Sequence, residues 1–140
     1  RDCEPAQPLT SGIYNWKDYD LPCAGLSDII SFHDYGKLED TKNRIQSLKQ
    51  YGRPLLCTEW LHRPNGNTIE SHLPLYKAEN IGAYHWGLVN GKTQTHLNWD
   101  KSKNKGGETS PWQHDIFTRD LKPHCEKEAA FIKDLSGKFS

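Results

Sequence analysis

The chain has 140 residues, which is enough for one domain or for part of a larger one. Its 18 lysine and arginine residues balance 18 aspartate and glutamate residues. This argues against nucleic acid or an anionic membrane as the main partner, because both attract a basic face. No apolar run approaches the roughly 20 residues of a membrane span. The first residues do not resemble a signal peptide, and the absence of methionine suggests a processed chain or a piece of a longer protein.

Four short apolar runs, each beginning after a turn signal, predict β-strands at 9–14, 28–33, 54–60 and 80–86. Apolar and polar residues alternate little within them, which suits strands covered on both faces of a parallel sheet. A pattern near a 3.6-residue period predicts a helix between the second and third runs. Its N-cap would be Asp40 or Thr41, and Gly52 would stop it.

Two further helices are predicted. A short one begins after Asn67 or Thr68 and carries Pro74, which a helix tolerates only in its first turns. The last covers about 125–135 and ends at Gly137. The stretch 100–111 is the most loop-like part of the chain.

Strands that alternate with helices are typical of parallel βα units and predict the α/β fold class. Four such units, in one partial domain over 1–140, make half of an eight-stranded βα barrel, which usually needs about 250 residues. A flavodoxin-like open sheet is the rival prediction. It would need a glycine-rich phosphate-binding loop after the first strand, and the sequence has none.

The cysteine and histidine spacings do not predict a metal site or a cofactor. No CxxC occurs among the four cysteines, and no HxxxH or HExxH among the seven histidines. Cys57 lies inside an apolar run, which favours a buried free thiol. Cys3 and Cys23 could pair if the protein is exported, and four cysteines allow three disulfide connectivities.

Titratable and aromatic residues stand at the carboxyl ends of three of the predicted strands, at 33–35, 58–60 and 84–87. In a βα barrel the chemistry lies at these carboxyl ends. By the two-residue period of a strand, Glu59 shares a face with Leu55 and Cys57 and is expected to point into the barrel mouth.

A poorly solvated carboxylate such as that of Glu59 needs hydrogen-bond donors. His33 and Tyr35, at the end of the neighbouring strand, could supply them and hold Glu59 ready as a nucleophile. The alternative is a structural salt bridge to Arg53 or Arg63.

Trp86 ends the fourth run and could offer a flat indole face to a sugar ring. The alternative is that it caps the core. Trp60 and Trp99 are weaker candidates for such a platform, and Trp112, near the last helix, is interpreted as structural.

In this order, the phrases PLTSG, SDIISFHDYG, RPLLCTEWL and NIGAYHWGLVNGKTQT resemble the C-terminal half of clan A glycoside hydrolases. The resemblance is to the family 5 (cellulase-like) and family 2-type barrels, and it covers nearly the whole chain. It implies that the four runs are the fifth to eighth strands of a (β/α)8 barrel.

The resemblance also implies roles for particular residues. Glu59 corresponds to the catalytic nucleophile, and His33 and Tyr35 to the pair that orients it and contacts the sugar. Trp86 would form the aromatic floor of that sugar position. Three residues of the following loop would contact sugar hydroxyls: Asn90, Lys92 and Gln94.

The function implied is hydrolysis of β-glycosidic bonds in poly- or oligosaccharides with retention, without cofactor or metal. The family's acid/base glutamate follows an asparagine, and no Asn-Glu pair occurs here. We therefore expect a fragment that is inactive alone and that pairs with a missing N-terminal half-barrel or self-associates, because a half-barrel has open edges. A non-catalytic carbohydrate-binding half-barrel is the alternative. Only the resemblance suggests a location, which would be secreted or periplasmic.

Overall fold

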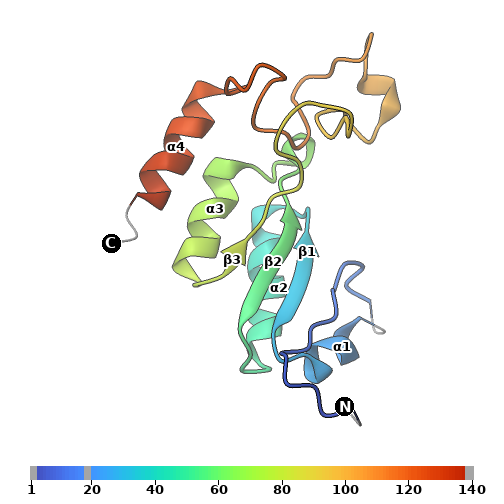
Figure 1. Cartoon of the computed structure of the whole chain (residues 1–140), viewed down its shortest axis with the longest axis vertical. Helices are drawn as coiled ribbons and strands as arrows, with labels where there is room; N and C mark the ends of the chain where they lie inside the picture. The colour runs from blue at the N-terminus through green and yellow to red at the C-terminus, as the bar shows by residue number, and fades with distance from the viewer. Residues whose placement is uncertain (1–2, 18–19, 138–140) are drawn as a thin grey trace.

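The computed structural model describes residues 3–17 and 20–137. The first two residues, which belong to the segment tested above for a signal peptide, lie outside these ranges. The longer elements, in chain order, are α1 (Leu21–Leu26), β1 (Ile30–Asp34), α2 (Leu38–Lys49), β2 (Leu55–Trp60), α3 (Ile69–Ala78), β3 (Gly82–Ala83) and α4 (Glu126–Ser136). Short 3-10 turns lie at Arg63–Asn65 and Lys101–Lys103. Figure 1 shows α4 beside α3, and the long segment after β3 gathered beyond the ends of the strands.

The sheet is open, parallel and three-stranded, in the order β1-β2-β3. On the side of β1 away from β2, Ile13 forms a parallel bridge with Phe32. The Ile13 amide donates to the carbonyl of Ser31 at 2.9 Å, and the Ile13 carbonyl accepts from the His33 amide at 2.8 Å. The four apolar runs therefore lie side by side in chain order, which confirms a mixed α/β fold with parallel strands.

Both outer strands are shorter than predicted. The run at 9–14 contributes only the bridge at Ile13, and the run at 80–86 contributes only β3. An outermost strand gains ladder hydrogen bonds from one neighbour only, so its pairing ends sooner. Helix α1 was not predicted. Its six residues bury Ala24 alone, which is too little to produce a periodic pattern.

Helix α2 begins earlier than predicted, because Lys37 is its N-cap rather than Asp40 or Thr41. Thr41 is fully buried, and its hydroxyl donates back to the Lys37 carbonyl at 3.2 Å. Asp40 lies in the first turn, where a carboxylate complements the helix dipole. The predicted stop is confirmed, since Gly52 follows the helix with a φ of 62°.

Of the two predicted caps of α3, Asn67 and Thr68, Thr68 is the N-cap. It forms a capping box with Ser71. Pro74 lies inside this helix, deeper than its first turn, so the backbone there loses one amide donor. Helix α4 is confirmed, with Cys125 before it and Gly137 after it.

The core lies between the sheet and helices α2 and α3, and its largest fully buried side chains include Trp60, Tyr76 and Phe32. Cys57 is a buried free thiol, as predicted, and burial raises its pKa to about 12. None of the four cysteines, all within the described residues, forms a disulfide. No helix in the described ranges is both long enough and apolar enough to cross a membrane.

Candidate functional site

A shift in register between β1 and β2 places the end of β2. Phe32 pairs with Cys57, but the next residue of β1, His33, pairs with Glu59. Thr58 is therefore an extra residue on β2, as in a β-bulge. The shift brings His33 directly beside Glu59 rather than beside Thr58.

The bulge also reverses the direction of Glu59. The Cys57 thiol lies 3.6 Å from the Tyr76 hydroxyl on α3, and the Trp60 ring lies 5.2 Å from the Tyr76 ring. Residues three apart share a strand face only when the alternation is interrupted. The prediction that Leu55, Cys57 and Glu59 share one face is therefore wrong. Glu59, next to Trp60, points to the face away from α3.

Two side chains from the end of β1 bind the Glu59 carboxylate. The Tyr35 hydroxyl donates to Oε2 of Glu59 at 2.9 Å, and Nδ1 of His33 lies 3.1 Å from the same oxygen. The side chains of His33 and Glu59 are 30% and 24% exposed, so the cluster is open to solvent. These are the two residues that the sequence predicts beside Glu59, and the hydroxyl of Tyr35 is a donor as expected. The alternative partner Arg63 instead binds Glu128.

Tyr35 remains a donor over a wide pH range. Burial raises the pKa of its phenol, and the hydrogen bond to Glu59 and the charge of that carboxylate raise it further. Asn65 donates to the Tyr35 carbonyl at 2.9 Å and so helps to hold this residue. The hydroxyl therefore stays protonated and directed at Glu59.

Asn67 ties the ends of β1 and β2 together, although its only predicted role was as a helix cap. It is fully buried. Its side-chain oxygen accepts from the Leu61 amide at 2.9 Å, and its side-chain nitrogen donates to the carbonyls of Asp34 and Gly36 at 3.2 and 2.9 Å. No local sequence signal reveals these bonds, because the partners are up to 33 residues away.

Three tryptophans differ in how far their side chains are exposed: Trp60, Trp112 and Trp99. Trp60 is 1% exposed and packs in the core, so the prediction of a sugar platform there is wrong. Trp112 is buried and stacks on His124 at 3.9 Å, which confirms a structural role. Trp99 is 56% exposed, and its ring lies 5.0 Å from that of Tyr35. Of the two weaker candidates from the sequence, Trp60 and Trp99, the structure therefore brings only Trp99 to the Glu59 cluster.

Trp86 follows β3 and lies beside the end of β2, where its amide donates to the Trp60 carbonyl at 3.0 Å. It is 44% exposed, so it does not cap the core. Asn90 is buried, and its amide bonds to the Phe117 carbonyl. The other two loop residues predicted to contact sugar line a separate depression beside Arg119: Lys92 and Gln94. Of the site residues predicted from the sequence, only His33, Tyr35 and Glu59 are therefore in direct contact with one another.

A polar depression of about 400 Å³ adjoins this cluster. Its wall includes His33 and Tyr35, together with Tyr14, whose ring lies 6.3 Å from that of His33. Arg44 also lines it and forms an ion pair with the buried Asp34 at 2.6 Å. The depression offers hydrogen-bonding groups beside the carboxylate.

His114 belongs to a buried network next to Tyr35. The Gln113 side-chain oxygen accepts from the Trp99 amide at 2.8 Å, so the Gln113 nitrogen is the atom that donates to Nε2 of His114 at 2.7 Å. Nε2 must then be an acceptor, and Nδ1 carries the proton that binds the Leu61 carbonyl. A second proton on His114 would break this arrangement. Burial lowers the pKa of His114 to about 4, and the nearby basic residues His62, Arg63 and His85 also lower it.

This lowered pKa predicts a loss of stability in acid. In the unfolded chain the imidazole has its ordinary pKa of 6.5, so between pH 6.5 and pH 4 the unfolded state binds more protons. The free energy of unfolding should fall by on the order of 2 kcal/mol as pH drops through this window, since one pKa unit corresponds to about 1.4 kcal/mol and solvent near Trp99 screens part of the effect.

The measurement is urea unfolding of the wild-type chain and of His114→Asn at several pH values. The variant keeps an amide donor for the Leu61 carbonyl but cannot titrate. Its stability deficit at pH 7 should therefore shrink as the pH falls towards 4. A deficit that stays constant with pH would contradict the prediction.

No family model and no curated protein matches this sequence. Within the described ranges, no group of three or more His, Cys, Asp and Glu side chains could hold a metal ion. The geometry of the site is therefore the basis for its function. One carboxylate, contacted by a phenol and an imidazole, lies at the carboxyl end of a parallel strand, with the exposed indole of Trp99 nearby.

Proposed function

We propose that the chain is the C-terminal half of the (β/α)8 barrel of a retaining β-glycoside hydrolase, with Glu59 as nucleophile. The observation that supports this most is the pair of contacts from Tyr35 and His33 to the Glu59 carboxylate at the carboxyl end of β2. The parallel order of the four apolar runs supports their assignment as the fifth to eighth strands.

The Tyr35 hydroxyl and Nδ1 of His33 both lie against Oε2 of Glu59, which leaves Oε1 as the oxygen that attacks the anomeric carbon. The attack breaks the glycosidic bond and forms a glycosyl ester, while a second carboxylic acid protonates the leaving oxygen. Water then cleaves the ester and restores the carboxylate. Retention requires the two carboxyl groups to lie about 5 Å apart. The nearby Asp34 is paired with Arg44, so the acid is expected from the other half of the barrel.

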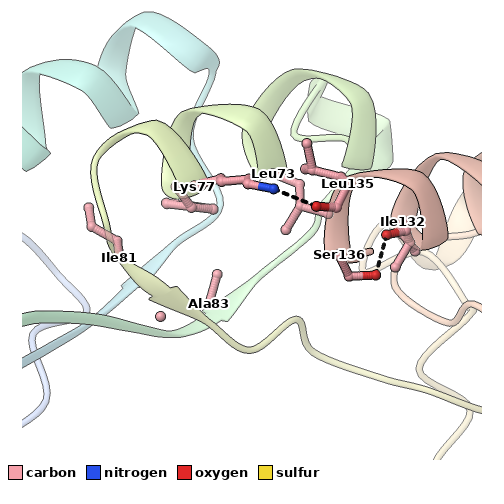
Figure 2. A pocket seen from close by; sticks show the side chains of 9 residues that line it. Leu73, Lys77, Ile81, Ala83, Ile132, Leu135 and Ser136 are labelled. Carbon is pink, nitrogen blue, oxygen red and sulfur yellow. Dashed lines mark hydrogen bonds between the residues drawn. The ribbon is translucent and has the colours of Figure 1, made fainter. Parts of the chain in front are cut away.

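The partners of this chain would be the carbohydrate and a second half-barrel, supplied by an N-terminal segment or by a second copy. Figure 2 shows an apolar hollow between α3, α4 and β3, lined by Leu73, Ile81, Ala83 and Ile132. It has a volume of about 280 Å³ and lies beside the free edge of β3. A further strand and helix against this edge would satisfy its backbone groups and cover the hollow.

A non-catalytic carbohydrate-binding role is the second candidate. The exposed rings of Trp86 and Trp99 favour it, since exposed indoles stack on sugars whether or not a bond breaks. The two candidates differ in what happens at Glu59. Only the enzyme forms a covalent bond there.

Trapping the glycosyl ester tests the proposal. We expect dinitrophenyl 2-deoxy-2-fluoro-β-cellobioside, -xylobioside or -mannobioside to label the longer protein that this proposal implies, because the activated leaving group needs no acid. Peptide mass spectrometry should find one adduct, on Glu59. Glu39→Gln, an exposed change on α2, should label like the wild type, and Glu59→Gln should not label.

An adduct on another carboxylate would overturn the assignment of Glu59. Binding of the glycosides without any adduct would favour the non-catalytic role. Neither outcome depends on the stability of the variants, because the wild-type protein alone provides both readouts.

A further inference from the structure

Trp99 is the most exposed of the five tryptophans and lies in the segment that follows β3. The Trp99 ring, left 56% exposed, forgoes the stabilisation that burial of an apolar ring would give the fold. One side of the Trp99 ring is nevertheless packed against other side chains. Its inner side packs on His62 at 4.6 Å and on His114 at 5.2 Å, as well as on Tyr35.

The backbone around Trp99 is held firmly. Its amide donates to the fully buried Gln113, which in turn donates to His114. On the preceding residue, the Asn98 amide donates to the Asn104 side-chain oxygen, and the Asn104 side-chain nitrogen donates to the Asn98 carbonyl, both at 2.9 Å. A buried network thus presents an exposed indole in one orientation, as a preformed binding surface requires.

The position of Trp99 relative to Glu59 follows from Tyr35. The Tyr35 ring touches Trp99 edge-on at 5.0 Å, and the Tyr35 hydroxyl touches Glu59 at 2.9 Å. A single side chain therefore separates the indole from the carboxylate.

We propose that Trp99 forms a second sugar-binding position beside Glu59, so that the site takes a β-linked oligosaccharide chain rather than a single glycosyl unit. This rests on the proposed function and names its substrate class. The C–H face of a pyranose stacks on the exposed indole face. Asp100 and Lys103 follow Trp99 in the same loop, and their charged groups lie 3.8 Å apart.

Calorimetric titration on the Glu59→Gln background tests this, because binding is then measured without turnover. The probes are cello-, xylo- and manno-oligosaccharides of two to six units, with maltohexaose as the α-linked control. We expect affinity to rise with chain length for at least one β-linked series. Trp99→Ala should lower the affinity for the hexasaccharide about tenfold and leave that for the shortest binding ligand nearly unchanged.

Trp99→Phe should keep part of the affinity, and Leu121→Ala, at an exposed site unrelated to the cluster, should change nothing. Circular dichroism of each variant verifies its fold. Equal losses at all chain lengths, unchanged affinity in Trp99→Ala, or no binding of any β-linked probe would overturn the second position. Adduct formation at Glu59 is measured separately, so a labelled Glu59 with unchanged Trp99→Ala affinity would leave the proposed function standing and reject this inference alone.

Discussion

Replacing Glu59 with glutamine should lower β-glycoside hydrolysis by the longer, barrel-completing protein by about 10⁴-fold or more. The amide has nearly the shape of the carboxylate and can still accept a hydrogen bond from Tyr35. It cannot donate an electron pair to the anomeric carbon with comparable ease. Initial rates with nitrophenyl β-cellobioside, β-xylobioside and β-mannobioside provide the measurement, and the fold should be unaffected.

The matched controls separate loss of the nucleophile from loss of structure. Glu39→Gln removes a carboxylate that is 77% exposed and should leave the rate unchanged. Glu59→Gly opens space for an external nucleophile, so added azide should restore turnover and yield a glycosyl azide of inverted configuration. Full activity in Glu59→Gln would remove the nucleophile assignment altogether.

Removing the carboxylate of Glu128 should destabilise the fold by about 3–5 kcal/mol, because the Arg63 charge would be left buried and unpaired. Nε and Nη2 of Arg63 donate to the two Glu128 oxygens at 2.8 and 2.7 Å. The two side chains are only 7% and 9% exposed. This pair joins α4 to the segment after β2, next to the Trp112 carbonyl, which Arg63 also contacts at 3.3 Å.

Urea unfolding of Glu128→Ala measures this effect. Glu126→Ala serves as the matched control, since it removes an exposed carboxylate from the same first turn of α4 and should cost less than about 1 kcal/mol. Glu128→Gln keeps the shape and part of the hydrogen bonding and should fall between the two. A change in Glu128→Ala no larger than in Glu126→Ala would show that the buried pair contributes little.

The central part of the candidate site could be predicted because its members follow adjacent strands. His33, Tyr35 and Glu59 stand at the carboxyl ends of two apolar runs, and parallel neighbours end at the same edge of a sheet. The face of Glu59 could not be derived correctly in the same way. It depends on the bulge at Thr58, which arises from pairing between strands rather than from the local pattern of β2.

Trp99 shows the same limit at longer range. In the sequence it is one aromatic residue in a polar stretch, and its importance comes from bonds to Gln113 and a ring contact to Tyr35. Trp60 is the opposite case, since the residue directly after Glu59 turns into the core. Exposure of a single ring depends on what the distant chain covers.

By itself, the sequence determined the helices at α2, α3 and α4, the central strands and the parallel α/β arrangement, because periodicity, caps and stops act over a few residues. The tertiary structure alone decided the length of the outer strands, the sheet face on which Glu59 lies and the position of the Trp99 ring. Each of these depends on hydrogen bonds or packing between segments far apart in the chain. Such contacts are set by the way the whole core assembles.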